Sequence, residues 1–190
     1  GGNMKRLIGF FMIATLMLLS GCGSDAYSKG LHHAELQVEG YGTITMELDA
    51  DTAPITVSNF CKLAKDGFYD GLRSIELLTD LGGDPEGNGS GGADQNIKGE
   101  FSQNGVENNI SHVRGTVSMA RSNDYNSASS QFFIVQSDST FLDGQYAGFG
   151  HVTSGMEIVD QICQDTPEED SNGTVAWWNQ PRITSIQILD

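Results

Sequence analysis

The stretch from Ser127 to Gly150 holds the side chains best suited to binding chemistry, an amide beside several aromatic rings. It reads S-A-S-S-Q-F-F-I-V-Q-S-D-S-T-F-L-D-G-Q-Y-A-G-F-G. Phe132 and Phe133 are neighbours in a strand-like run, so their rings point to opposite faces and at least one lies in the core. Gln131 by itself would be an ordinary surface residue of that strand.

No spacing of metal ligands accompanies this stretch. Three cysteines and four histidines are scattered over 190 residues, and His32–His33 is a dipeptide rather than a grid of ligands. We therefore expect no metal and no cofactor, and we expect the histidines to be surface residues.

The stretch resembles the central segment of the cyclophilins, the peptidyl-prolyl cis-trans isomerases. Further blocks match in order: A-P-I-T-V-S-N-F (Ala53–Phe60), G-F-Y-D-G-L (Gly67–Leu72), G-G-D-P-E-G-N-G-S-G-G (Gly82–Gly92), G-T-V-S-M-A (Gly115–Ala120) and G-H-V-T-S-G-M-E-I-V-D (Gly150–Asp160). The resemblance covers roughly residues 34–190, and the order and spacing of its blocks argue against a chance match.

The resemblance implies an enzyme that accelerates rotation about the peptide bond before proline. That rotation faces a barrier of about 18–20 kcal/mol, which arises from amide resonance. Catalysis needs no nucleophile, proton shuttle or metal, but a pocket that binds the twisted amide better than either planar form. An apolar slot would hold the proline ring, and a donor aimed at the prolyl nitrogen would favour its pyramidal state.

The resemblance also implies roles for individual residues. The expected lining of the proline slot is Met119, Phe133, Phe141 and Leu142. Gln131 is expected to bind the substrate backbone in the catalytic site, and Ala120 and Arg121 form the strand edge along which the peptide lies. Tyr146 stands where many family members have histidine, and Phe141 where several have tryptophan. Both changes should alter the affinity for the cyclic-peptide inhibitors of the family more than they alter the reaction.

One block departs from the family pattern, and it should carry the catalytic arginine. After Leu72 the family continues with a segment like R-F-H-R-I-I-D-G-F-M-I-Q, whereas this chain has R-S-I-E-L-L-T-D-L from Arg73 to Leu81, three residues fewer. The loss of one base from the second codon, followed by a skip of eight bases after Leu81, would produce both the new residues and the shortfall. We therefore hypothesise a frameshift in the gene or in its reading.

Taken as written, this block allows two alignments. If the three missing residues are placed before Leu72 in the alignment, Arg73 occupies the catalytic position and could still reach the prolyl nitrogen. If the gap falls later, no arginine is available and the site is impaired. The segment should also be a barrel strand, in which Glu76 and Asp80 replace near-apolar residues and could weaken the fold.

Regular elements must position these side chains. The pattern predicts strands at 34–38, 43–48, 115–120, 131–135 and 183–189, and helices at 54–65 and 155–164. Pro54 opens the first helix, because proline is tolerated in a first helical turn. Gly82–Gly92 is too rich in glycine for a regular element. The fold class is therefore mainly β, and the resemblance implies a closed eight-stranded antiparallel cyclophilin-like barrel capped by two helices.

Charge and the N-terminus indicate where the protein works. The net charge of −15 argues against nucleic acid and anionic membrane surfaces as electrostatic partners. Lys5 and Arg6 precede an apolar run from Leu7 to Leu19 that is short for a transmembrane helix and typical of an export signal. The L-S-G-C that ends at Cys22 resembles a bacterial lipobox, so we expect cleavage before Cys22 and lipidation of this residue.

The chain therefore divides into a signal peptide (1–21), a lipidated cysteine with a flexible tether (22–33) and one cyclophilin-like domain (34–190). We expect an exported monomer, anchored through its lipid to the outer face of the bacterial cell membrane. Cys61 and Cys163 could form a disulfide after export. The apolar helical pattern around Cys61 instead favours a buried free thiol.

The implied function is isomerisation of X-Pro bonds in proline-containing polypeptides during the folding of exported proteins, with impaired activity if the arginine is lost. The alternative is a non-catalytic module of the same fold that binds proline peptides as a chaperone. A surface adhesin or structural lipoprotein would predict no proline pocket, and Gln131, Phe133, Phe141 and Leu142 argue against it.

Overall fold

The computed structural model describes residues 26–73, 80–87, 89–166 and 175–190. Its strands are β1 (Leu31–Val38), β2 (Gly42–Asp49), β3 (Asp80–Gly82), β4 (Thr116–Met119), β5 (Phe132–Ile134), β6 (Ala147–Ser154) and β7 (Ile183–Ile188). Its α-helices are α1 (Pro54–Lys65) and α2 (Met156–Asp165), and three short 3₁₀ helices are η1 (Ser102–Asn104), η2 (Thr140–Leu142) and η3 (Trp177–Asn179). The fold is therefore mainly β with two helices, as predicted.

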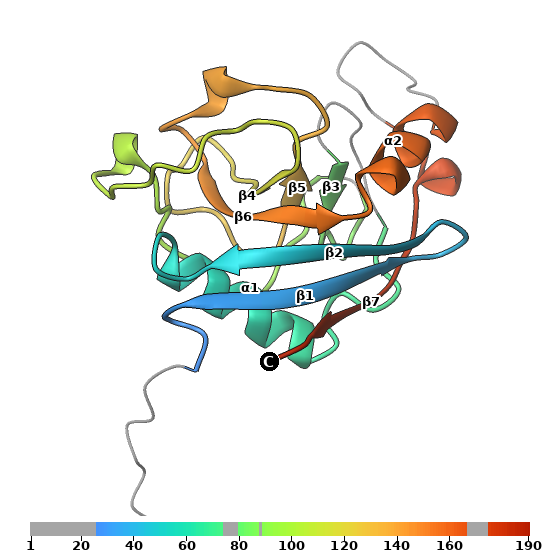
Figure 1. Ribbon diagram of the computed structural model, residues 1–190, viewed down its shortest axis with the longest axis horizontal. Coiled ribbons are helices and arrows are strands. Elements are labelled where there is room, and N and C mark those ends of the chain that lie inside the picture. Colours follow the sequence, from blue (N-terminus) through green and yellow to red (C-terminus); the bar gives the residue numbers. More distant parts are fainter. Residues whose placement is uncertain (1–25, 74–79, 88, 167–174) are drawn as a thin grey trace, which may run out of the picture.

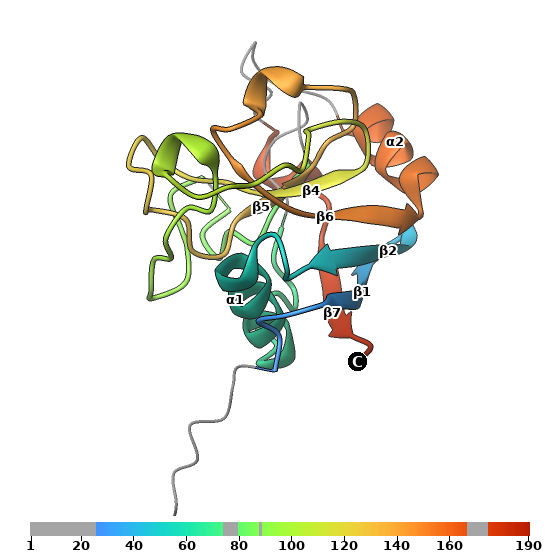
Figure 2. The same cartoon turned by 60° about the vertical axis from the view of Figure 1, so that its left-hand side comes forward.

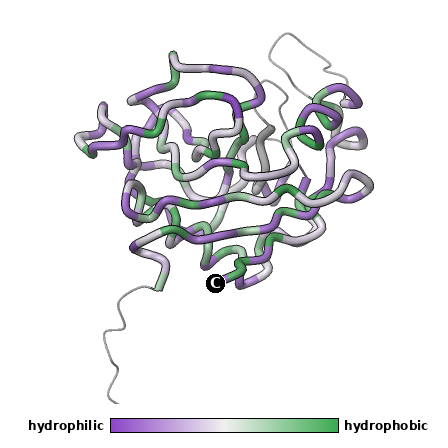
Figure 3. The backbone as a smooth tube through the Cα atoms, in the orientation of Figure 1, coloured by the Kyte–Doolittle hydropathy of each residue, from purple (hydrophilic) through white to green (hydrophobic). Residues whose placement is uncertain are grey.

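The described strands form one antiparallel sheet with the order β3-β5-β4-β6-β2-β1-β7. Figure 1 shows that this sheet curls, with β1, β2 and β6 across its front. Along β1 and β2 every second side chain is buried, and Figure 3 shows the matching alternation of hydrophobic and hydrophilic residues. The first strand begins at Leu31, three residues before the predicted start, so part of the expected tether is paired in the sheet.

The expectation of a closed eight-stranded barrel is wrong for the described part of the chain, which forms seven strands with β3 and β7 at the two ends of the sheet. Arg73 makes single bridges to Asp84, which follows β3, and to Arg182, which precedes β7. These bridges join the two ends of the sheet at one residue rather than along a strand. Of the strand expected over Arg73–Leu81, residues 74–79 lie outside the described residues, whereas Asp80 and Leu81 are paired in β3.

The two helices start from different local signals. Pro54 occupies the first turn of α1, as predicted, and the helix ends at Lys65, shortly before Gly67 at a φ of 71°. Helix α2 directly follows β6 and buries Val159 and Ile162. Figure 2 shows α1 and α2 at separate ends of the sheet, where α1 packs on β7 and α2 contacts β2.

An aromatic cluster fills the core between α1 and the sheet. The Phe60 ring of α1 lies 5.2 Å from Phe132, 5.3 Å from Tyr69 and 5.3 Å from Phe149, measured between centroids. All four side chains are at most 1 % exposed. Aromatic contacts of this kind stabilise a fold beyond the area that they bury. They fix α1 and β5 relative to each other, and β5 carries the candidate site.

A buried carboxylate caps α1. Glu100 is 2 % exposed, and its Oε1 accepts a hydrogen bond from the Ile55 amide at 3.0 Å. Its Oε2 accepts from the Thr56 amide at 2.8 Å and from the Thr56 hydroxyl at 2.7 Å. The first amides of a helix lack hydrogen-bond partners within the helix, and a negative charge there also interacts favourably with the positive end of the helix dipole. Glu100 therefore anchors the loop around residue 100 to α1.

We expect Glu100→Gln to lower the free energy of unfolding by about 1–3 kcal/mol, because a buried charge-assisted network loses its charge. Urea denaturation followed by circular dichroism measures this change. Glu157→Gln is the matched control, because Glu157 places an exposed carboxylate in the first turn of α2. An equal decrease in the free energy of unfolding in both variants would show that Glu100 contributes only as a negative charge near a helix end.

Cys61 and Cys163, the two cysteines of the described residues, do not form a disulfide: Cys61 is buried, as predicted, and Cys163 is half-buried. Within the described ranges, no helix combines the length and hydropathy needed to cross a membrane. In the same ranges, no three His, Cys, Asp or Glu side chains gather in a way that would hold a metal ion.

Candidate functional site

Strand β5 separates the core from the candidate site. Phe132 packs into the core against Phe60, which confirms the prediction for this residue. The ring of Phe133 lies on the opposite face, 5.9 Å from the ring of Tyr146 at an interplanar angle of 83°. It also stacks on His112 at 6.1 Å and 23°. Phe133 is only 4 % exposed, so it forms the floor of any slot on this face, and its role in binding proline stays a prediction.

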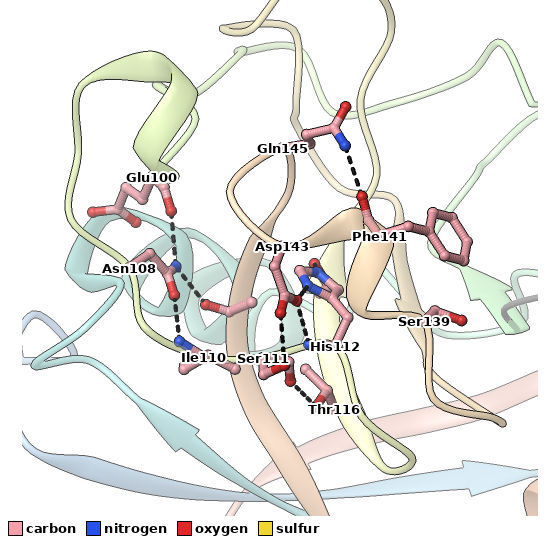
Figure 4. A network of polar contacts seen from close by, with 12 residues as sticks. Glu100, Asn108, Ile110, Ser111, His112, Thr116, Ser139, Phe141, Asp143 and Gln145 are labelled. Atoms are coloured by element: carbon pink, nitrogen blue, oxygen red, sulfur yellow. Dashed lines mark hydrogen bonds and ion pairs between the residues drawn. The ribbon is translucent and has the colours of Figure 1, made fainter.

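The other predicted slot residues are dispersed. Met119 is 2 % exposed and belongs to the core cluster, where it pairs with Phe132 across β4 and β5. Phe141 is 74 % exposed on η2, and Figure 4 shows its ring pointing away from the polar network beside it. Leu142 and Tyr146 are half-buried. The structure thus brings Phe133 and Tyr146 into contact and leaves Phe141 in solvent.

The residues predicted to hold the substrate backbone share one cavity of about 420 Å³. Gln131, Ala120 and Arg121 line it, together with Gly89–Ala93, Asn96, Ser122, Ser127 and Ser129. The side-chain Nε2 of Gln131 donates to the carbonyl of Gly91 at 2.6 Å and to that of Gly89 at 3.2 Å. The Ala120 amide donates to the Gln131 carbonyl at 2.9 Å. These contacts place a glycine-rich loop, the end of β4 and the start of β5 around one opening.

Arg73 lies elsewhere. Its Nη1 donates to the Gln180 carbonyl at 3.1 Å, and the residue lines a separate cavity of about 350 Å³ with Asp84 and Arg182. The structure does not bring Arg73 and Gln131 to one described cavity. The sequence alone allowed Arg73 at the catalytic position, and that role stays a prediction.

The sequence pattern did not predict the polar network of Ser111, His112, Ser118 and Asp143, which is buried at His112 and Ser118. Figure 4 shows His112, Ser111 and Asp143 of this network. The Oδ1 of Asp143 accepts from the His112 amide at 2.7 Å and lies 2.9 Å from its ring Nδ1. The Ser111 hydroxyl donates to Oδ2 of Asp143 at 2.7 Å, and His112 Nε2 lies 2.9 Å from the Ser118 hydroxyl. His112 and Ser118 are both fully buried, so this array is closed to a substrate and does not act as a nucleophile. It fastens the loop after η2 to strand β4.

The expectation that the histidines are surface residues is wrong for two of the four. His112 is 0 % exposed, and His32 is 8 % exposed. Each can be buried because both ring nitrogens have partners, which for His32 are Asp190 and the Lys29 carbonyl. No periodicity of single residues indicates those partners.

The same network makes the stability depend on pH. Burial alone would raise the pKa of Asp143, but hydrogen bonds from the His112 amide, the Ser111 hydroxyl and the His112 ring outweigh it and lower the pKa. A lowered pKa in the folded state means that ionised Asp143 stabilises the fold above its unfolded pKa of about 3.9. That contribution is lost as the pH falls through the lower, folded pKa.

We expect the free energy of unfolding to fall as the pH drops below about 4, and Asp143→Asn to remove part of that decline. Urea denaturation at a series of pH values measures both slopes. Asp66→Asn, at an exposed position after α1, is the control for the loss of one carboxylate. A wild-type slope in Asp143→Asn would refute this assignment.

Comparison with known proteins agrees with the fold. The family described as "Cyclophilin type peptidyl-prolyl cis-trans isomerase/CLD" matches residues 33–188. A peptidyl-prolyl cis-trans isomerase A of Dickeya dadantii is 40 % identical over 166 residues, which cover 84 % of this chain and 85 % of that protein. A peptidyl-prolyl cis-trans isomerase of Helicobacter pylori is 41 % identical over 128 residues, which cover 65 % of this chain and 76 % of that protein.

Solved structures give the same answer. A cyclophilin-type isomerase of Cryptosporidium parvum superposes with a TM-score of 0.72 at 26 % identity and covers 85 % of this chain and 99 % of its own. The same protein, crystallised in the presence of the dipeptide Ala-Pro, superposes with a TM-score of 0.71 and covers 83 % of this chain. The chain therefore belongs to the cyclophilin-type peptidyl-prolyl cis-trans isomerases, which are enzymes of class EC 5.2.1.8.

Proposed function

We propose that this chain isomerises X-Pro bonds in exported polypeptides while they fold, and that it does so on the outer face of the cell membrane. The observation that carries the proposal is that Gln131, Ala120 and Arg121 line the same cavity. Gln131 directly precedes β5, the strand that carries Phe133. The isomerase family and the names of its relatives support the reaction. The location rests on the export and lipidation signals in residues 1–22.

The chemistry that the site can perform is preferential binding of a twisted amide. The cavity offers backbone and side-chain polar groups for the substrate chain, and Phe133 offers an apolar surface for the proline ring. Interactions that are stronger in the twisted state than in either planar state lower the barrier. Arg73, the donor that the sequence predicted for the prolyl nitrogen, instead donates to the Gln180 carbonyl and lines another cavity.

The reaction is tested by nuclear magnetic resonance exchange spectroscopy on a proline tetrapeptide, with the full chain purified in detergent. The proposal is supported if the chain makes cis-trans exchange of the peptide faster than the uncatalysed exchange, which takes tens to hundreds of seconds. A chain that binds the peptide without accelerating exchange supports the alternative, a non-catalytic proline-peptide-binding chaperone module. The position of Arg73 outside the cavity of Gln131 is the observation that favours this alternative.

The location has its own test. We expect the wild-type chain, expressed in a bacterium, to incorporate labelled fatty acid and to sediment with membranes. Cys22→Ser removes the thiol that the lipid would occupy, so this variant should lose the label. Cys163→Ser, which changes a half-buried cysteine within the domain, should keep it. Labelling of the Cys22→Ser variant would contradict the proposed anchor.

A further inference from the structure

Arg121 is held between three aromatic rings at the edge of the cavity. The guanidinium carbon lies 4.6 Å from the ring centroid of Tyr146, 4.9 Å from that of Tyr125 and 5.1 Å from that of Phe101. Cations placed over aromatic faces within about 6 Å are attracted to them. Rings from three separate segments therefore fix the guanidinium in place, and it loses little conformational freedom when it binds a partner.

The hydrogen bonds of Arg121 leave some N–H donors of its guanidinium available. Nε donates to the Gln145 carbonyl at 2.9 Å, and Nη1 donates to the Ser122 carbonyl at 2.9 Å. Both acceptors are neutral carbonyls, and within the described ranges no carboxylate forms an ion pair with Arg121. A guanidinium has five donors, so donors on Nη1 and Nη2 remain for a ligand.

The cavity itself favours a negative ligand group. Arg121 is the one ionisable side chain among its described lining residues. The other side chains there are uncharged: serines, Asn96 and Gln131, with glycines and alanines. The carboxylates of Asp94 and Asp124 are exposed, and those of Glu86 and Asp84 accept from the Ser90 hydroxyl and the Gly89 amide; none of the four residues lines the cavity. A carboxylate bound here would pair with a fixed cation, which gives a charge-assisted hydrogen bond.

We propose that this cavity is a subsite that selects an acidic side chain near the proline of the substrate, with Arg121 as the specificity-determining residue. The proposal rests on the proposed function, since the cavity shares Ala120 and Gln131 with the predicted path of the substrate backbone. The acidic residue lies within a few positions of the proline, because the cavity adjoins the strand that carries Phe133. The selection is local, because the whole chain carries a net charge of −15 and repels acidic polymers at long range.

The test uses the full chain and peptides with one proline, in which Asp or Asn occupies each of three positions on either side. For the wild type we expect kcat/KM for Asp to exceed that for Asn by about tenfold at one position, and the ratio to shrink as salt is added. Arg121→Gln should bring the ratio to about one. Arg114→Gln loses the same charge from a pair with Asp160 and should keep the wild-type ratio.

Two further measurements separate the possible outcomes. Arg121→Lys keeps the charge but loses the planar fork, so it should retain only part of the Asp preference. If no peptide is isomerised, the proposed function fails, and calorimetric binding of the same Asp and Asn peptides then tests the subsite by itself. Equal binding or equal turnover of Asp and Asn peptides by the wild type at every position would overturn the proposal. So would a preference that Arg121→Gln leaves unchanged.

Discussion

Replacing Arg73–Leu81 with the family-like segment R-F-H-R-I-I-D-G-F-M-I-Q is expected to raise kcat/KM on proline peptides by about tenfold or more. The replacement supplies an arginine for the prolyl nitrogen, whose contact forms fully only in the twisted state. Each tenfold in rate corresponds to about 1.4 kcal/mol of transition-state stabilisation. In the present chain Arg73 instead donates to Gln180 and lines a cavity apart from that of Gln131.

The gain must be separated from a simple repair of the fold. A matched control carries the same replacement with its second arginine changed to glutamine, which restores the strand but not the donor. We expect this control to match the repaired chain in urea denaturation and to resemble the present chain in kcat/KM. If the present and repaired chains were equally active, another donor would serve, and the frameshift hypothesis would have no functional consequence.

Phe133→Leu in the repaired chain is expected to lower kcat/KM by about tenfold or more, because the apolar surface under the proline ring loses its aromatic face. The neighbouring Phe132→Leu should instead lower stability and leave kcat/KM nearly unchanged. It opens space in the core beside Phe60 and Tyr69, so the free energy of unfolding should fall by about 1–3 kcal/mol. Its kcat/KM should stay within about threefold of the parent, because the changed ring faces away from the site.

The pair of variants distinguishes a binding role from packing. Exchange spectroscopy gives kcat/KM, and urea denaturation gives stability, for both. Phe133 contacts His112 and Tyr146 rather than the core cluster, so its substitution should cost less stability than that of Phe132. A larger loss of kcat/KM in Phe132→Leu than in Phe133→Leu would reverse our assignment of the two faces of β5.

Elements governed by local signals could be predicted from the sequence. Helix α1 begins at Pro54 and ends at Lys65, where the pattern placed it, and the hairpin of β1 and β2 turns at its glycines. Proline and glycine act on their own backbone angles, and the alternation of β1 and β2 follows from the two faces of a strand. The ordered motifs also predicted the family, because they span nearly the whole domain.

Strand β6 was not predicted, because Gly148 and Gly150 interrupt its hydrophobic pattern. The tertiary structure explains both glycines. A Cβ atom at Gly148 would lie 2.7 Å from the Ile110 side chain, and one at Gly150 would lie 2.4 Å from the Glu47 carbonyl. Neighbouring segments approach the backbone of β6 too closely for a side chain, and that approach depends on residues far along the chain.

The details of the site were decided by tertiary structure for the same reason. Glu100 caps α1 through the amide of Ile55, 45 residues earlier in the chain, and His112 contacts Asp143, 31 residues later. The rings that hold Arg121 come from three segments, and the cavity that receives Arg73 lies between the ends of the sheet. The sequence by itself determined the family, the helices and most strands, because these depend on local backbone preferences and ordered motifs. Burial, capping and the neighbours of each charge depend on contacts between distant segments, and only the folded chain determines them.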